Sequence, residues 1–219
     1  LVGEPFFVVP CIGGITVCGI VVKENLQQKI KLANKLMKDV RVLSIFEAES
    51  SEFNSNLTKT DLEILEQLIK EPRKKIESIS KDSGLSTKTI TRCIEKLHEN
   101  EGIQFTVIYD PIKIQGFIPH AILAWIDGDL RETLKKMNEE FHDSFMQIPF
   151  IAKNQIVLFM YSNDIFGMDE LTQRVRNMDN VKSVDLFIPK TISLPLKWLR
   201  EAINDAKKLP TLHLGYQTN

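Results

Sequence analysis

The chain has 219 residues, of which 43% are hydrophobic and 26% are charged, as expected for a folded soluble protein with one large or two small domains. Its formal net charge of −1 argues against a nucleic-acid-binding protein that works by bulk positive charge, although a local basic patch is compatible with it. The three cysteines, Cys11, Cys18 and Cys93, are an odd number in a chain too large to need disulfides for stability, which predicts reduced thiols and a cytoplasmic protein. Neither the cysteines nor the four histidines have metal-ligand spacing, so no structural zinc is expected.

The first apolar stretch, PFFVVPCIGGITVCGIVV at residues 5–22, is uncharged and about as long as a short membrane helix. Pro10 and the pair Gly13-Gly14 interrupt it, and Val, Ile and Phe dominate the remainder. These features favour two buried strands joined by a tight Gly-Gly turn over a membrane span. The chain begins with Leu1 and no basic leader precedes the stretch, so a signal peptide is not expected either.

The order of predicted elements repeats within the chain. After the hairpin come a helix with a one-sided apolar face at 24–37 and a strand at 40–47. The same strand, strand, helix, strand order returns at 145–151, 155–161, 167–178 and 181–189. Residues 30–46 align without gaps on 171–187, and the alignment matches Met37, Val40 and Phe46 with identical residues. The shared order predicts a tandem repeat more strongly than these three identities do.

The second copy has two further elements in front of it, a strand at 120–127 and an amphipathic helix at 130–141. Together they complete a βαββαβ unit at 119–190, the ferredoxin-like arrangement with two helices on one face of a four-stranded sheet. The first copy, at 1–50, lacks the opening strand and helix. We therefore expect it to be the C-terminal half of another ferredoxin-like domain, within a longer tandem protein.

The middle of the chain predicts a DNA-binding domain at 57–118, after a polar linker at 51–56. A first helix starts near Thr58 or Thr60, and a short second one spans 74–84. The third helix, LSTKTITRCIEKL, has Ser86 as its N-cap and a buried stripe of Ile90, Ile94 and Leu97. Two short helices joined at Gly84 form a helix-turn-helix, and GIQFTVIY at 102–109 would supply the strand of a wing.

These motifs, in this order, resemble the Lrp/AsnC family of leucine-responsive regulatory proteins. The resemblance rests on LTKTDLEILEQL, ISKDSGLSTKTITRCIEKLHENEGI and YDPIKIQGF, and it covers about residues 57–189. It implies an α+β fold, a winged helix-turn-helix followed by a ferredoxin-like sensing domain, and a transcriptional regulator that binds double-stranded DNA. It also implies self-association through the sheets as a dimer, and a small-molecule effector. The tandem repeat adds the alternative that the sheets pair within one chain as an internal pseudo-dimer. The family's Gly and Asp near the effector site are not matched, because this chain has Ala152 and Gln155 in that hairpin.

The candidate DNA-binding residues lie in two groups. The recognition helix at 86–97 would present Ser86, Thr87, Lys88, Thr91 and Arg92 to the major groove, with Glu95 on the same face. Arg73, Lys74 and Lys75, between the first two helices, would grip backbone phosphates. Residues 57–104 carry nine Lys/Arg and nine Asp/Glu, so one such domain should bind weakly and paired domains are expected on DNA.

Two alternatives stay open from the sequence. One is an enzyme similar to the siroheme decarboxylases, which have the same architecture. The stretch that follows His142 lacks their arginine. The other is a degenerate winged helix that mediates protein–protein contacts. No catalytic residue, cofactor, metal or membrane partner is expected, and the cofactor-binding residues stay unassigned. A last helix and tail at 191–219 should dock within the protein.

Overall fold

The computed structural model describes residues 2–48, 57–100, 103 and 105–208, so the predicted linker at 51–56 lies outside the described residues. The chain forms two compact units. The first consists of residues 1–50 and 106–194, and the second of residues 51–105 and 195–219. Each unit is thus assembled from two separate stretches of the chain.

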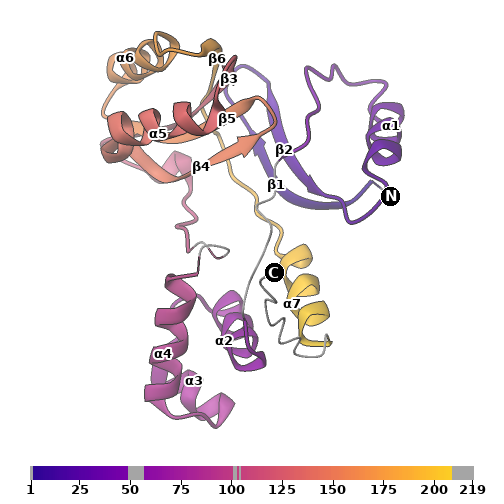
Figure 1. The fold of residues 1–219 in the computed structure, drawn as a ribbon, viewed down its shortest axis with the longest axis vertical. Helices are drawn as coiled ribbons and strands as arrows, with labels where there is room; N and C mark the ends of the chain where they lie inside the picture. The colour runs from indigo at the N-terminus through magenta and orange to yellow at the C-terminus, as the bar shows by residue number, and fades with distance from the viewer. Residues whose placement is uncertain (1, 49–56, 101–102, 104, 209–219) are drawn as a thin grey trace, which may run out of the picture. The chain divides into compact units, whose positions relative to one another are not determined.

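The larger part of the first unit is a four-stranded antiparallel sheet with two helices on one face (Figure 1). The strand order is β4-β5-β3-β6, in which the central strand β3 pairs with both β5 and β6. The elements are β3 (Ile118–Ile126), α5 (Leu130–Phe141), β4 (Phe145–Ala152), β5 (Gln155–Ser162), α6 (Ile165–Arg176) and β6 (Val181–Phe187). Short 3₁₀ turns, η1 (Pro111–Lys113) and η2 (His142–Ser144), precede β3 and β4. The predicted ferredoxin-like βαββαβ unit is confirmed.

Alternation along the strands builds the core of this sheet. Side chains of a strand point to opposite faces in turn, so every second residue of β3 and β5 faces α5 and α6. These residues are almost completely buried together with apolar residues of the helices: Ile122, Ala124, Ile126, Ile156, Leu158, Met160, Met137, Phe141 and Val175. Burying each large side chain contributes about 1.5–3 kcal/mol.

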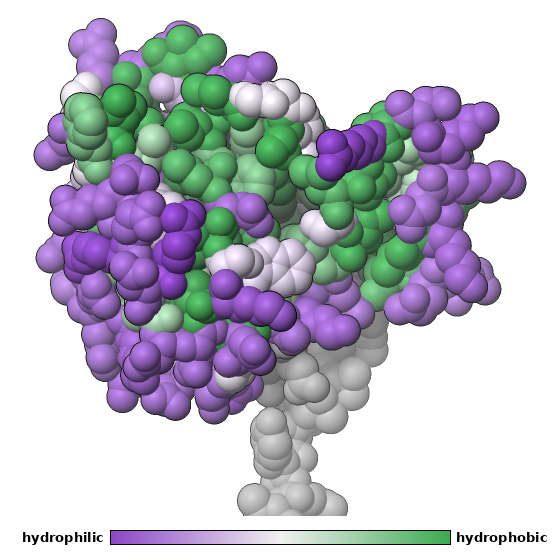
Figure 2. Space-filling view, turned by 90° about the horizontal axis from the view of Figure 1, so that it is seen from above, coloured by the Kyte–Doolittle hydropathy of each residue, from purple (hydrophilic) through white to green (hydrophobic). Residues whose placement is uncertain are grey.

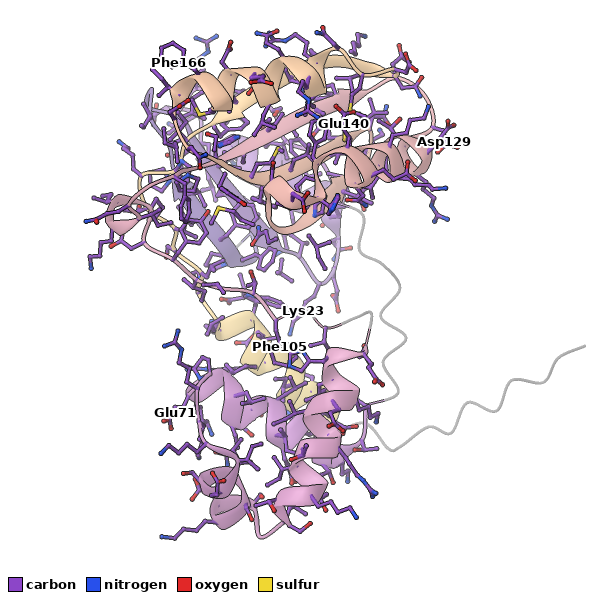
Figure 3. All side chains as sticks on the ribbon, turned by 90° about the vertical axis from the view of Figure 1, so that its left-hand side faces the viewer. Lys23, Glu71, Phe105, Asp129, Glu140 and Phe166 are labelled. Carbon is purple, nitrogen blue, oxygen red and sulfur yellow. The ribbon has the colours of Figure 1, made fainter. Side chains whose placement is uncertain are left out.

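Aspartate side chains start both helices of this unit. Asp129, whose side chain lies at the start of α5 in Figure 3, accepts a hydrogen bond from the Glu132 N–H at 2.9 Å. Asp164 accepts one from the Gly167 N–H at 2.7 Å and starts α6 two residues before the predicted position. Each cap satisfies a backbone donor that has no partner within the helix and so fixes where the helix begins.

The N-terminal segment forms the predicted hairpin. Strands β1 (Glu4–Pro10) and β2 (Thr16–Val21) pair antiparallel as a separate two-stranded sheet. Gly13 and Gly14 both have positive φ in the turn, at 85° and 83°, a conformation that favours glycine. Helix α1 (Leu26–Leu36) follows, with Ala33 buried. No helix in the described part of the chain has the length and apolar character needed to cross a bilayer.

The strand predicted at 40–47 is wrong. Residues 41–47 form no regular structure, and Val40 and Leu43 are 64% and 62% exposed. Ala48 makes an isolated antiparallel bridge to Ala152. In the second copy the corresponding strand, β6, is held by β3. Among the described residues no strand takes the place of β3 beside 40–47, so its backbone groups have no ladder to join.

Four helices make up the described part of the second unit: α2 (Lys59–Lys70), α3 (Ile76–Ser83), α4 (Thr87–His98) and α7 (Lys197–Lys208). Ile64, Ile79, Ile90 and Leu97 form its core at 0% exposure, and Ile94 packs against them half-buried. The predicted stripe of the third helix is thereby confirmed.

The C-terminal helix α7 docks within the protein, as predicted, and its partner is α2. Lys207 bonds the Glu66 carboxylate at 2.5 Å, and Lys70 bonds it at 2.8 Å. Hydrogen bonds from these two lysines lower the pKa of Glu66 to about 2. Helix α7 therefore extends the second unit, although it follows the ferredoxin-like unit in the chain.

The predicted wing strand is also wrong for the residues that the structure describes. Residues 103 and 105–109 contain no strand. The Phe105 ring stacks on the His98 ring instead, with centroids 4.2 Å apart. A wing needs a second strand for pairing, and none of the described residues of this unit forms one.

Candidate nucleic-acid interface

The turn between α3 and α4 is built around Gly84. Its φ of 71° is left-handed, and its N–H bonds the Ser80 carbonyl at 2.9 Å, which ends α3. Ser80 Oγ donates to the Leu85 carbonyl at 2.6 Å, and Ser83 Oγ donates to the Ile79 carbonyl at 2.7 Å. The turn therefore fixes the direction in which α4 leaves α3.

Substitution of Gly84 tests this turn. Gly84→Val is expected to lower the free energy of unfolding of this unit by about 1–2 kcal/mol, because a β-branched residue strongly disfavours positive φ. The cost is conformational, since a Cβ at this position would meet no atom within 4 Å. Gly84→Asn is the matched control, because asparagine tolerates the left-handed region better. Urea unfolding curves measure the difference, and equal stability of the two variants would contradict the role of the turn.

Two predicted DNA-binding hydroxyls are used inside helix α4. Ser86 Oγ accepts the Thr89 N–H at 3.2 Å and lies 2.9 Å from Thr89 Oγ1, so Ser86 is the N-cap. Thr91 Oγ1 donates to the Thr87 carbonyl at 3.1 Å. Both hydroxyls stabilise the helix. Each oxygen can still accept a further hydrogen bond from a group outside the helix.

The outward face of α4 carries the remaining predicted residues. Thr87, Lys88, Arg92 and Glu95 are exposed, whereas Ile90 and Leu97 on the opposite side are buried. Lys88 and Arg92 are one turn apart and form no ion pair with any described residue of the chain. Two unpaired cations and a threonine on one exposed helical face can contact phosphates or base edges, and Glu95 limits the positive charge there.

The second predicted group lies in the loop between α2 and α3. Arg73 and Lys75 are exposed, and Lys75 occupies the N-cap position of α3. Lys74 is different, because it bonds Gln67 Oε1 at 2.5 Å and forms an ion pair with Asp82, with only 13% of its side chain exposed. Glu71, which ends α2, projects from the same loop (Figure 3). Lys74 thus ties the loop to α2 and α3 and offers little charge to a ligand.

A buried carboxylate that sequence reasoning missed joins α2 to α4. Asp61, with a side chain only 2% exposed, accepts the Lys96 ammonium at 2.5 Å and the Thr58 N–H at 2.8 Å. Thr58 Oγ1 in return accepts the Asp61 N–H, which completes a capping box. Burial alone would raise the pKa of Asp61, but the hydrogen bonds from Lys96, Thr58 and Cys93 outweigh it and lower that pKa. The Thr-x-x-Asp spacing signals the cap in the sequence, whereas Lys96, 35 residues away, gives no such signal.

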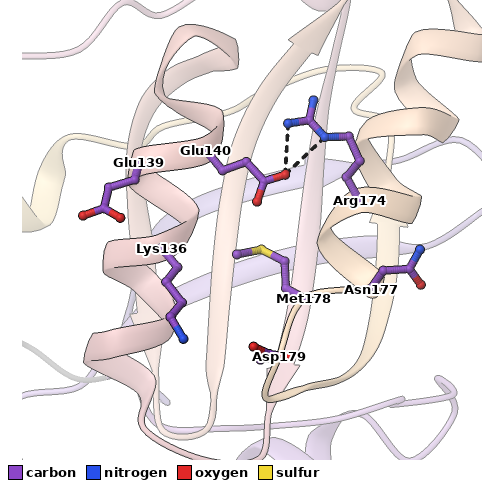
Figure 4. A pocket seen from close by; sticks show the side chains of 7 residues that line it. All are labelled: Lys136, Glu139, Glu140, Arg174, Asn177, Met178 and Asp179. Atoms are coloured by element: carbon purple, nitrogen blue, oxygen red, sulfur yellow. Dashed lines mark hydrogen bonds and ion pairs between the residues drawn. The ribbon is translucent and has the colours of Figure 1, made fainter.

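The ferredoxin-like unit has a shallow pocket between α5 and the end of α6 (Figure 4). It is lined by Lys136, Glu139, Glu140, Arg174, Asn177, Met178 and Asp179. Arg174 donates to Glu140 Oε1 through Nε at 3.2 Å and Nη2 at 3.0 Å, and its guanidinium lies 4.9 Å from the Phe141 ring. The main cation of the pocket is therefore already paired and stacked.

Gln155, at the turn of the β4–β5 hairpin, is 2% exposed, and its Oε1 has no hydrogen-bond partner in the described structure. Among the described residues no cluster of three or more His, Cys, Asp or Glu could hold a metal ion. His120 is buried, which lowers its pKa, and His142 lies exposed beside Asp143. His213 lies outside the described residues.

Comparison with known protein families gives one match, which lies within the second unit. Residues 57–103 match a family model described as winged helix-turn-helix DNA-binding. No curated protein sequence matches the chain.

Several solved structures are similar to the chain. One is AsnC of E. coli, at 18% identity over 64% of this chain and 93% of that one, with a TM-score of 0.39. Another is an AsnC family transcriptional regulator from Agrobacterium tumefaciens, at 21% identity over 65% and 99%, with a TM-score of 0.42. A third is a transcriptional regulator from Neisseria meningitidis in complex with L-Met, at 20% identity over 65% and 99%, with a TM-score of 0.44. Residues 57–103, which match the winged helix-turn-helix DNA-binding family model, coincide with α2, α3 and α4.

Proposed function

We propose that this protein is a sequence-specific, non-catalytic transcriptional regulator of the Lrp/AsnC type, which binds duplex DNA with α4 in the major groove. The observation that carries the proposal is the family match at 57–103, together with Lys88 and Arg92, which are exposed on α4 and form no ion pair with any described residue. The ferredoxin-like unit would serve self-association and the sensing of a small-molecule effector.

The charge of the DNA-binding region supports a function in pairs. Several of its cations are neutralised internally: Lys74 by Asp82, Lys96 by Asp61, and Lys70 at Glu66. The proposed DNA contacts are the remaining exposed residues: Thr87, Lys88, Arg92, Arg73 and Lys75. One domain with so few contacts should bind DNA weakly, because the affinity rises with the number of phosphates that the protein neutralises. Two domains on neighbouring half-sites would supply the remaining affinity.

A salt-titrated binding assay on genomic duplex fragments tests the proposal. Binding is expected at low salt, and the logarithm of the binding constant should fall linearly with the logarithm of the salt concentration. Light scattering on the same samples measures whether the bound species is paired. Absence of duplex binding at low salt would contradict the proposed function, and binding without sequence preference among fragments would contradict its sequence-specific part.

A further inference from the structure

The N-terminal hairpin and the segment after α1 carry an exposed apolar surface. On β2, Cys18 is exposed and Ile20 is 44% exposed. Residues 40–46 add Val40, Val42, Leu43, Ile45 and Phe46, which are all exposed. Figure 2 shows hydrophobic side chains gathered around a hollow between the main body of this unit and the lobe that contains α1. Apolar groups gathered in this way mark an interaction surface.

The second copy of the repeat shows what this surface lacks. In the first turn the Cys11 N–H donates to the Ile15 carbonyl at 2.7 Å, and in the second turn Ala152 pairs with Gln155. Matching the two turns aligns β2 with β5, so that Thr16, Cys18 and Ile20 correspond to Ile156, Leu158 and Met160. The three β5 residues are 0% exposed beneath the helices, whereas all three β2 residues are exposed. The exposed face of β2 is therefore the face that belongs under a helix.

Two isolated bridges support the same correspondence independently. Cys11 bridges Pro189, and Ala48 bridges Ala152. Cys11 and Ala152 are 141 residues apart, and so are Ala48 and Pro189. This is also the offset between residues 30–46 and 171–187. The two bridges are thus one contact made twice, as between halves related by a two-fold axis. The first copy of the repeat, residues 2–48, is thus arranged against the ferredoxin-like sheet as part of another such domain.

Among the described residues, the first copy has no counterpart of one strand, β3, and one helix, α5. In the complete domain, β3 lies between β5 and β6, pairs with both, and leads into α5. Within the described residues β2 pairs with β1 alone, and residues 41–47 stay unpaired. One added strand that pairs with both β2 and residues 41–47 would therefore take the role that β3 has between β5 and β6.

We propose that β2 accepts a partner segment consisting of one β-strand followed by an amphipathic helix. The strand would add antiparallel to β2 and pair on its other side with residues 40–47, which would then become a strand. The helix would cover Cys18 and Ile20, as α5 and α6 cover Leu158 and Met160. The partner segment should resemble residues 118–141 of this chain. That stretch is an apolar strand of nine residues followed by a helix of twelve, in which Met137 and Phe141 are buried.

A fusion protein tests the inference. A second copy of residues 116–144 is placed before Leu1 of the full chain through a flexible Gly-Ser linker of roughly 15 residues, which gives an effective concentration near the millimolar range. The Cys18 thiol should then react with a labelling reagent at least about tenfold more slowly than in the unfused chain, because labelling requires local opening. Tandem mass spectrometry distinguishes Cys18 from Cys11 and Cys93, and amide hydrogen exchange of residues 40–47 should slow in parallel.

The matched control carries Ile122→Pro and Ala124→Pro in the added copy alone. Proline lacks the N–H that a ladder needs, so this fusion should label Cys18 as fast as the unfused chain does. Ile20→Lys in the first fusion should restore fast labelling, because it places a charge beneath the helix. Equal Cys18 labelling rates in the two fusions, whether fast or slow, would overturn the inference. This outcome is independent of DNA binding and leaves the proposed function untouched.

Discussion

Replacing Lys88 and Arg92 together with alanine is expected to weaken duplex DNA binding about 100-fold or more at physiological salt. Both side chains project from the exposed face of α4 and have no ion-pair partner among the described residues. A lysine or arginine that contacts a base or phosphate contributes about 1–3 kcal/mol, and 1.4 kcal/mol is a factor of ten in affinity. Fluorescence anisotropy on the best-bound genomic fragment measures the change, and the salt slope should become shallower by up to about 2.

The matched control removes the same charge from the ferredoxin-like unit, as Lys135→Ala with Lys182→Ala. Both lysines are exposed, and this variant should change affinity less than about threefold, because salt screens charges that make no contact. Circular dichroism should show unchanged helix content in both variants, since neither pair supports the core. Unchanged DNA affinity of the Lys88 and Arg92 variant would move the DNA-reading surface away from α4.

Asp61→Ala is expected to lower the free energy of unfolding of the second unit by about 3 kcal/mol at pH 7, because it removes one partner of a buried ion pair and a helix cap together. Asp61 is buried, whereas Lys96 is 43% exposed and can reach water, so the loss lies at the low end for buried pairs. Such a change is a large fraction of the stability of a small domain. Urea unfolding followed by circular dichroism measures it. Asp82→Ala is the control, with little change expected, because the Asp82 side chain is 49% exposed.

The pH dependence separates the charge of Asp61 from its packing. The pKa of this carboxyl is lower in the folded protein than in the unfolded chain, so its contribution is present above the unfolded pKa of about 3.9 and disappears as the pH falls below it. The stability difference between the wild type and Asp61→Ala should therefore shrink between pH 5 and pH 2. Burial and the Asp61 charge raise the pKa of the Cys93 thiol, and the variant should label Cys93 faster at pH 8. A difference that stays constant over the pH range would assign the effect to packing alone.

The helices and strands that the sequence determined are those with a strong local signal. Ser86, the stripe of Ile90, Ile94 and Leu97, and the left-handed Gly84 locate α4 without any tertiary information, because caps, periodicity and positive φ act over a few residues. The sequence also predicted the βαββαβ order of residues 118–187, because its central strands are short apolar runs and its helices are amphipathic.

The two strand predictions that are wrong share one physical cause. Residues 40–47 and 102–109 have the composition of strands, but a strand forms only where a neighbour completes its hydrogen bonds. No described strand pairs with the described residues of either segment. Composition cannot report the presence of a neighbour, so a pattern of β-branched and aromatic residues predicts the capacity for a strand and not its formation.

What the sequence by itself determined is the order of the helices and strands in both units and which face of α4 is buried. The tertiary structure alone decided which cations are available there: Lys74 and Lys96 are bound to Asp82 and Asp61, whereas Lys88 and Arg92 are not. It also placed α7 on α2, through a lysine and a glutamate that are 141 residues apart. The physical reason is the same in each case. Ion pairs and helix docking depend on the distance in space between residues that are remote in the chain, and local sequence patterns carry no information on that distance.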